Sequence, residues 1–226
     1  MLEKILEVER GAFLFLNGCH HPFWDSFMWL YSGKEVWIPV VLFFLFMLFY
    51  KNEWKESLLI VLSIVLVIAL CDQFTSSICK PYFMRFRPTH HPDFMEFVKT
   101  VNDYRGGKYG FMSGHAANAF GFAMFSLLLF RYRWYSISIL LWATIMAYSR
   151  IYLGVHFISD IVPGIFVGML FGYLVYNLYV AIHRKLLKKT DKPCRIYSES
   201  RKRMILYGLF CTILWLLVYS IFNTYI

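Results

Sequence analysis

The amino-acid sequence predicts an all-α protein, a polytopic membrane bundle of about six transmembrane helices preceded by an N-terminal interfacial amphipathic helix. Its 226 residues are 59% hydrophobic and only 16% charged, whereas soluble domains contain about 45–50% apolar and about 25% charged residues. The apolar residues form runs long enough to cross a bilayer, without the alternation typical of strands. Because lipid requires backbone groups to be satisfied internally, this pattern favours a helical bundle.

The first 33 residues are expected to form an interfacial N-terminal region. Residues 1–17 alternate charged side chains with Leu, Ile, Val and Phe at helical spacing, which is typical of an amphipathic helix lying on a membrane. The pair His20-His21, followed by Pro22, marks a solvated turn more often than a metal site. The acidic start of the chain lacks a cleavable apolar run, so no signal peptide is predicted.

Six apolar segments are predicted to span the membrane. The first begins near Lys34 and continues through Val36–Tyr50, and we expect it to include residues upstream because its apolar part is short for about 30 Å of hydrocarbon. The second carries Asp72, for which a functional role and a structural hydrogen bond are both open. The second to sixth segments cover 57–79, 113–131, 134–153, 157–182 and 204–223.

The distribution of basic residues predicts the orientation in the membrane. The net charge is +9, but the basic residues fall mostly between apolar segments, which favours anionic headgroups over nucleic acid as their partner. With six spans, the turns 51–56 and 131–133 share a side with the loop 183–203, which alone holds nine Lys and Arg. The positive-inside rule places that side in the cytoplasm. The insertion 80–111, the stretch 149–160 and both termini are then expected on the outer face.

The first of three candidate site segments on the outer face is Lys80–Pro88. Lys80 and Arg87 are seven residues apart, about two helical turns, so both can point the same way before Pro88 ends the helix. A flexible ammonium and a forked guanidinium make a suitable phosphate clamp. Taken alone, however, such residues more often anchor a helix at the membrane boundary.

The second segment is centred on Ser113, Gly114 and His115, where a polar loop meets a helix rich in small residues. Ser113 is a natural N-cap, and the free N–H groups after it can bind phosphate. Gly114 allows an anion to approach the backbone closely. His115 lies in the first turn, where it could donate a proton to a leaving oxygen. An ordinary capped helix with an interfacial histidine is an equally good explanation of this segment alone.

The third segment contains Arg150, His156 and Asp160. On a helix, His156 and Asp160 are four residues apart and share a face, so the carboxylate can hold one imidazole nitrogen and leave the other free. Arg150 has a planar fork suited to phosphate. A single histidine at a helix end is usually structural, but this combination indicates a phosphoryl-transfer site.

Together these segments resemble the three signature motifs of the type 2 phosphatidic acid phosphatase (PAP2) family. Order, spacing and placement at membrane boundaries all match for Lys80-(six residues)-Arg87-Pro88, Ser113-Gly114-His115 and Ser149-Arg150-(five residues)-His156-(three residues)-Asp160. One departure is Met112, where the family usually has the proline that shapes the loop entering the helix.

The resemblance implies a role for each matched residue. His156 would be the nucleophile that forms a phosphohistidine, Asp160 would orient it, and His115 would be the general acid. The resemblance also implies that no metal or other cofactor is required, because basic groups supply the positive charge. The groups that would hold the phosphoryl oxygens are Lys80, Arg87, Ser113, Gly114 and Arg150.

The implied activity is that of a bacterial lipid phosphatase in the inner membrane, with its active site facing the periplasm. Its expected partners are the bilayer and a membrane lipid phosphate, with no nucleic acid and no obligate protein partner. Lipid A phosphate and undecaprenyl diphosphate are the leading substrates, and phosphatidylglycerophosphate is a third. The insertion 80–111 would shape the headgroup pocket, and its segment Arg105–Gly110 is either a lid or a plain connector.

Several alternatives stay open at this point. A lipid phosphotransferase would pass the phosphate to an acceptor, and a binder or transporter without turnover would keep its function after His156→Ala. A haloperoxidase shares the anion pocket, but such enzymes are soluble. A metal site is possible on composition, built from His90, His91, His115 and His156.

Overall fold

The computed structural model describes residues 2–186 and 197–225. The predicted helical membrane fold is confirmed: within these ranges the chain forms helices, and its β-structure is confined to an isolated bridge between Phe86 and Tyr109. The α-helices are α1 (Leu2–Gly18), α2 (Pro22–Ser32), α3 (Ile38–Phe49), α4 (Trp54–Asp72), α5 (Lys80–Phe83), α6 (Gly114–Phe130), α7 (Arg133–Tyr152), α8 (Ile158–Leu186) and α9 (Glu199–Tyr225). Short 3₁₀ turns η1 (Glu35–Trp37) and η3 (Pro88–His90) and the π-helix η2 (Gln73–Cys79) complete the described elements.

Three helices of the described part are long and apolar enough to cross a membrane: Trp54–Phe83, which joins α4, η2 and α5, then Ile158–Lys185 and Glu199–Thr224. The first span in the structure differs from the one that the sequence predicts. Its upstream residues form α2, which is bent by 70° from Glu35–Phe49, so the pair makes a fourth span only if it is counted as one broken helix. The helix stops at Gly33, whose backbone is extended (φ −69°, ψ 155°). Helix α2 packs against α7 and α9.

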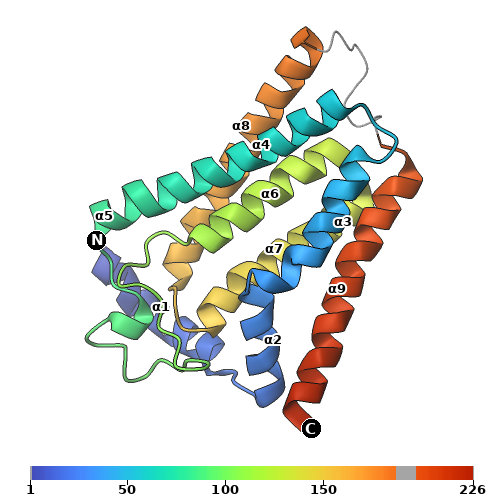
Figure 1. Cartoon of the computed structure of the whole chain (residues 1–226). Coiled ribbons are helices and arrows are strands. Elements are labelled where there is room, and N and C mark those ends of the chain that lie inside the picture. Colours follow the sequence, from blue (N-terminus) through green and yellow to red (C-terminus); the bar gives the residue numbers. More distant parts are fainter. Residues whose placement is uncertain (1, 187–196, 226) are drawn as a thin grey trace.

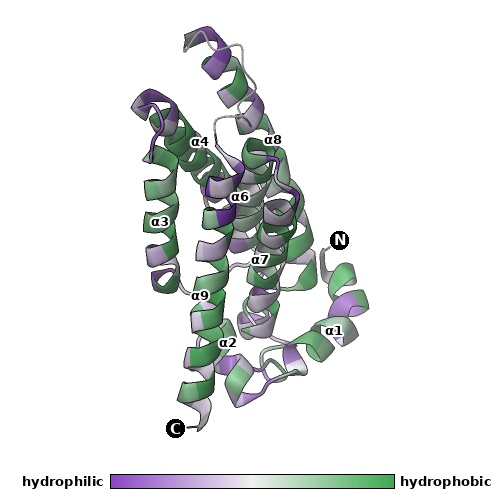
Figure 2. Cartoon of the chain, turned by 90° about the vertical axis from the view of Figure 1, so that its right-hand side faces the viewer, coloured by the Kyte–Doolittle hydropathy of each residue, from purple (hydrophilic) through white to green (hydrophobic). Residues whose placement is uncertain are grey.

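The connections gather at two ends of the bundle. The turns between α3 and α4 and between α6 and α7 lie at one end, where α8 finishes, while α1, the 84–113 insertion and the C-terminus lie at the other (Figure 1). Hydrophobic residues run along the middle of the helices, and hydrophilic ones collect at the ends of α4 and α8 (Figure 2). This arrangement matches the predicted grouping of the loops. Within the expected basic loop 183–203, residues 187–196 lie outside the described residues.

A row of glycines brings α8 against α6, at the centre of the bundle. Gly164, Gly168 and Gly172 recur every four residues and therefore share one face of α8. A Cβ at Gly168 would lie only 2.2 Å from the carbonyl oxygen of Ala117. Small residues at this spacing let two membrane helices approach to backbone contact. The close packing sets the N-terminal ends of α6 and α8 side by side, and both carry residues of the candidate site.

Helix α1 is docked onto the end of the bundle that carries the 84–113 insertion (Figure 1). Its buried face includes Phe13, whose ring packs against Phe94 of the insertion and Phe157 before α8. The Asn17 amide donates to the carbonyls of Ile151 and Tyr152 at 3.2 and 2.9 Å. The opposite face exposes apolar residues, Val8 and Phe15 among them. The amphipathic helix predicted from the sequence therefore contacts the site through one face and leaves an apolar face uncovered.

Candidate active site

Lys80 and Arg87 come together by a route that differs from the predicted one. They do not lie on one helix, because the helix ends at Phe83 and Met84 adopts a left-handed backbone (φ 44°). The chain then runs extended, and the Arg87 N–H donates to the Lys108 carbonyl at 3.1 Å. Lys80 remains on the helix, where its Nζ donates to the Ser76 hydroxyl at 3.1 Å. Pairing with the far arm of the insertion therefore places Arg87.

Arg87 is held from behind by backbone groups. Its Nε donates to the Tyr109 carbonyl at 3.1 Å, and its Nη1 lies 3.5 Å from the Val155 carbonyl. Gly106 has a left-handed backbone (φ 67°), and a Cβ there would lie 2.7 Å from Arg87 Nη1. The Gly-rich segment Arg105–Gly110 thus supports the guanidinium at close range. This contact gives the segment a supporting role, whether or not it also moves.

Ser113 starts α6 as its N-cap, and its hydroxyl accepts from the Ala116 N–H at 3.4 Å. The Ser113 side chain is fully buried, and its N–H donates to the Asp160 carbonyl at 3.0 Å. Ser113 therefore lies behind the site, while Gly114 and His115 reach the cavity described below. Met112, which replaces the family proline, is buried beside this cap, and the Phe111–Met112 peptide bond is cis. The capped helix forms with methionine at this position.

Arg150 and His156 flank a tight turn between α7 and α8. Gly154 has φ 72°, and a Cβ there would lie 2.5 Å from Val98 Cγ1, so only glycine fits. The turn folds back on the end of α7, since the N–H groups of Val155 and His156 both donate to the Arg150 carbonyl. His156 consequently precedes α8, while Asp160 lies in its first turn.

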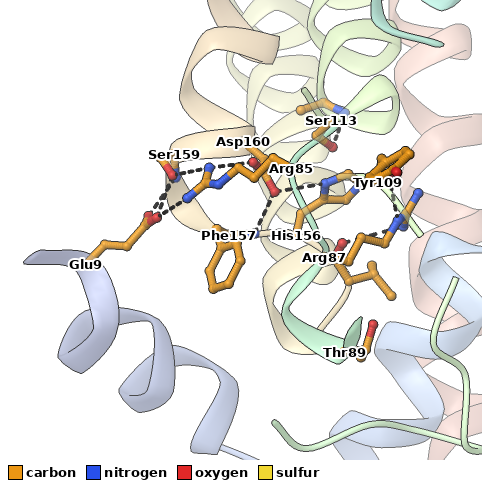
Figure 3. Close-up of polar contacts among 12 residues, drawn as sticks. Glu9, Arg85, Arg87, Thr89, Tyr109, Ser113, His156, Phe157, Ser159 and Asp160 are labelled. Carbon is orange, nitrogen blue, oxygen red and sulfur yellow. Dashed lines mark hydrogen bonds and ion pairs between the residues drawn. The ribbon is translucent and has the colours of Figure 1, made fainter. Parts of the chain in front are cut away.

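The two residues predicted to pair, His156 and Asp160, do meet. His156 Nδ1 lies 3.4 Å from Asp160 Oδ2, a long contact without hydrogen-bond geometry, and this buried nitrogen has no hydrogen-bond partner among the described residues. Asp160 Oδ2 instead accepts from the Phe157 N–H at 3.0 Å (Figure 3). Gly110 packs against the same carboxylate, because a Cβ there would lie 2.9 Å from Oδ2. The aspartate is thus fixed in place independently of the histidine.

Two functional candidates escaped the sequence reasoning, Arg85 and Glu9. Arg85 Nη1 donates to Asp160 Oδ1 at 2.7 Å, and its Nη2 lies 2.9 Å from Glu9 Oε1 (Figure 3). Ser159 closes the network, because its N–H donates to Glu9 Oε2 at 2.8 Å and its hydroxyl binds Glu9 and Arg85. Arg85 lies within the Lys80–Pro88 segment but is not one of the two residues predicted there to bind phosphate, and the sole sequence signal for Glu9 is its place in the amphipathic helix.

The predicted residues converge on a cavity of about 710 Å³. Six of the eight line it, namely Lys80, Arg87, Gly114, His115, Arg150 and His156, whereas Ser113 and Asp160 lie behind. Lys34, Asp72, Tyr104 and Asn118 add further polar lining. The rest of the wall is mainly apolar and comes from α3, α4, α6, α7 and α9, with Phe44, Ile64, Phe122, Trp142 and Leu209 among its residues. An apolar chamber therefore leads to a cationic end.

The electrostatics of this end favour a neutral His156 facing an anion. Burial, together with the positive charges of Arg87, Arg150 and Lys80, holds the pKa of His156 well below its usual 6.5. A neutral imidazole has a free electron pair, which a nucleophile requires. The same three cations supply the positive potential that a phosphate needs. The site therefore combines an anion pocket with a histidine that is ready to attack.

The histidines considered for a metal site do not gather. His90 and His91 lie on the insertion, and the His91 ring packs against Phe94 and Phe157. His115 and His156 line the cavity. Among the residues with described positions, no three His, Cys, Asp or Glu side chains are arranged to hold a metal ion.

The sequence pattern of the PAP2 superfamily matches residues 60–184, more than half of the chain. The chain belongs to this superfamily. It is 47% identical to a lipid A 4′-phosphatase of Porphyromonas gingivalis over 90% of this chain and 87% of that protein. A lipid A 4′-phosphatase of Bacteroides thetaiotaomicron is 37% identical over 98% of this chain and 99% of that protein. The crystal structure of Aquifex aeolicus LpxE, 26% identical, superposes with a TM-score of 0.53 and covers 74% of this chain and 93% of that one.

These similarities cover all three motifs and the helices around them. The prediction of a PAP2-type phosphatase in a bacterial membrane is therefore confirmed. The roles of the individual residues are argued next from the geometry.

Proposed function

We propose that the protein is a lipid A 4′-phosphatase that works through a phosphohistidine on the periplasmic face of the inner membrane. The observation that carries the mechanism is the buried His156 with Asp160 behind it and a cation-lined cavity in front. The substrate assignment is supported by two lipid A 4′-phosphatases that match nearly the whole chain. The apolar chamber suits the acyl part of a lipid.

In the first step, Lys80, Arg87 and Arg150 bind the phosphoryl oxygens, helped by the free N–H groups at the start of α6. His156 attacks phosphorus through Nε2, because Nδ1 faces Asp160. The bond from phosphorus to the sugar oxygen breaks as His115, which the negative charge of the bound phosphate keeps protonated, gives that oxygen a proton. The imidazole becomes positively charged on phosphorylation, and Asp160 stabilises it. Ser113 contributes by capping α6 and not by direct contact with phosphate.

In the second step, water attacks the phosphohistidine. His115, now neutral, takes a proton from the water, the bond from nitrogen to phosphorus breaks, and phosphate leaves with His156 restored. The three fixed cations again stabilise the charge of the transition state. The residues that face the phosphate supply all the positive charge that these steps use.

The substrate is tested with purified full-length protein in detergent and equal concentrations of lipid A, undecaprenyl diphosphate and phosphatidylglycerophosphate. We expect phosphate release chiefly from lipid A, complete loss of release in His156→Ala, and unchanged turnover in EDTA. Preference for undecaprenyl diphosphate, or equal turnover of all three, would overturn the substrate assignment. Transfer of the phosphate to an added lipid or sugar acceptor would instead identify a phosphotransferase.

The orientation is tested by labelling in intact cells. In a variant without its native cysteines, Cys introduced at Arg105 in the insertion should react with a membrane-impermeant maleimide. Cys introduced at Arg133, at the opposite end of the bundle, should react only after lysis. The reverse pattern would place the site in the cytoplasm.

A further inference from the structure

The carboxylate behind the nucleophile is part of a longer chain of charges that begins on α1. Glu9, Arg85 and Asp160 alternate in sign, and all three side chains are shielded, with 9%, 1% and 0% of their surface exposed. Arg85 bridges the two carboxylates, and its guanidinium also lies over the Phe157 ring, 4.8 Å from the centroid. Buried charges of this kind are tolerated only when each is paired and hydrogen-bonded.

We propose that Glu9 and Arg85 are positioning residues for catalysis, which set the orientation and effective charge of Asp160 and through it the basicity of His156. This inference rests on the proposed role of His156 as the nucleophile. Under this proposal, α1 contributes a positioning residue to the active site, although α1 lies outside the three signature motifs.

The hydrogen bonds explain why the carboxylate depends on this pair. Asp160 Oδ1 accepts from Arg85, and Oδ2 accepts from the Phe157 N–H, so groups other than His156 hold both oxygens. Glu9 in turn fixes Arg85, and both Glu9 oxygens are occupied, one by Arg85 and the Ser159 hydroxyl and the other by the Ser159 N–H. The positive charge of Arg85 offsets part of the negative potential that Asp160 exerts on His156. The negative charge of Glu9 in turn offsets part of the effect of Arg85.

The charged and titratable groups around His156 come from every element that packs on it. They are Asp160 on α8, Lys80 on α5, Arg87 in the insertion, Arg150 on α7 and His115 on α6. Glu9 and Arg85 stand behind Asp160 and do not line the cavity. Changing them therefore leaves the phosphate-binding groups in place, which separates their effect from substrate binding.

The test compares Glu9→Gln, Arg85→Gln and the double variant in purified protein with lipid A. The dependence of kcat/KM on pH is measured, together with inhibition by inorganic phosphate. Loss of the Arg85 charge should strengthen the pull of Asp160 on the imidazolium and move the acidic limb up by about one pH unit. Loss of the Glu9 charge should move the limb the opposite way, so that Glu9→Gln keeps a larger fraction of its activity at acidic pH. The double variant, which restores the local net charge, should return the limb towards that of the wild type.

A purely structural pair would change activity only through thermal stability and would leave the acidic limb in place. For a positioning pair, we expect kcat to fall in Arg85→Gln while KM and phosphate inhibition stay constant, because orientation of the nucleophile is lost and the phosphate site is intact. Glu7→Gln, on the exposed face of α1, and Arg133→Gln, at the far end of the bundle, are the matched controls and should match the wild type.

The inference is overturned if the acidic limb stays fixed in all three variants and activity simply follows thermal stability. If Arg85→Gln does not fold, Glu9→Gln decides alone, because it leaves Arg85 and Asp160 as a neutral pair. If Glu9→Gln then keeps the same fraction of its activity at acidic pH as the wild type, the proposal is rejected. Failure of the proposed function is distinguishable, because it would appear as turnover retained in His156→Ala.

Discussion

Asp160 is bound more tightly by Arg85 than by His156. The Arg85 Nη1 to Asp160 Oδ1 distance is 2.7 Å, whereas His156 Nδ1 lies 3.4 Å from Asp160 Oδ2. The carboxylate is therefore oriented before reaction, and its contact with the imidazole can shorten once phosphorylation makes the ring positive. Catalytic hydrogen bonds are often long in the absence of substrate and tighten in the transition state.

Gly110 should be required for this arrangement. A methyl group in Gly110→Ala would lie 2.9 Å from Asp160 Oδ2 and 3.2 Å from Arg87 Cγ, so it must displace one or both side chains. We expect kcat to fall by about 10- to 100-fold, because small misplacements of reacting groups cost about that much. Gly107→Ala, three residues away with no atom within 4 Å of its added Cβ, should retain wild-type kcat in the same assay. Equal activities of the two variants would contradict the prediction.

The two arginines of the cavity should not be replaceable by lysine. Arg87 and Arg150 line the cavity that we propose binds the phosphate, and a lysine there would keep the charge but lose the paired donors of the planar guanidinium. A lost hydrogen bond to a charged group costs about 1.5–3 kcal/mol, so Arg150→Lys should weaken inhibition by inorganic phosphate about 10- to 100-fold. Arg133→Lys, exposed at the other end of the bundle, is the control. Unchanged phosphate inhibition in Arg150→Lys would remove this residue from the binding site.

The pH dependence should show a nucleophile that stays neutral in mild acid. Burial and the cations Arg87, Arg150 and Lys80 lower the pKa of His156, so protonation inactivates it only well below pH 6.5. As pH falls through that lowered pKa, kcat/KM should decrease, and Arg87→Gln should move this limb to higher pH by removing a positive charge. His90→Gln, on the insertion, should leave the limb in place. A wild-type limb at or above pH 6.5 would show that another group controls activity.

The glycine face of α8 should limit stability. In Gly168→Ala the new Cβ would lie 2.2 Å from the Ala117 carbonyl oxygen, so α6 and α8 must separate. Overpacking of a tight interface costs about 1–3 kcal/mol, which should appear as a lower midpoint of thermal unfolding in detergent. Gly11→Ala, on α1 with open space around it, should be neutral or slightly stabilising, because alanine favours a helix over glycine. A wild-type midpoint in Gly168→Ala would show that the interface can relax.

Much of the helical framework could be read from local patterns. The predicted third span 113–131 is α6 (Gly114–Phe130), and the fourth, 134–153, is α7 (Arg133–Tyr152), because an apolar run ends where polar or turn residues begin. The break at Gly33 was not predicted, since a short apolar run does not reveal whether the chain continues straight or bends. The six predicted spans correspond to the bent pair α2–α3, the three long helices, and the helices α6 and α7.

By itself, the sequence determined the three motifs and most of the residue types that line the cavity's polar end, since order and spacing within each motif are local properties of the chain. Only the tertiary structure decided how they meet. Arg87 reaches the cavity because the insertion pairs with itself, and Ser113 lies behind it because α6 packs against α8. The contact between Glu9 and Arg85 joins residues 76 positions apart, and no sequence pattern encodes such a pair. Burial makes that pair necessary, because charges withdrawn from water must find partners wherever the fold brings them.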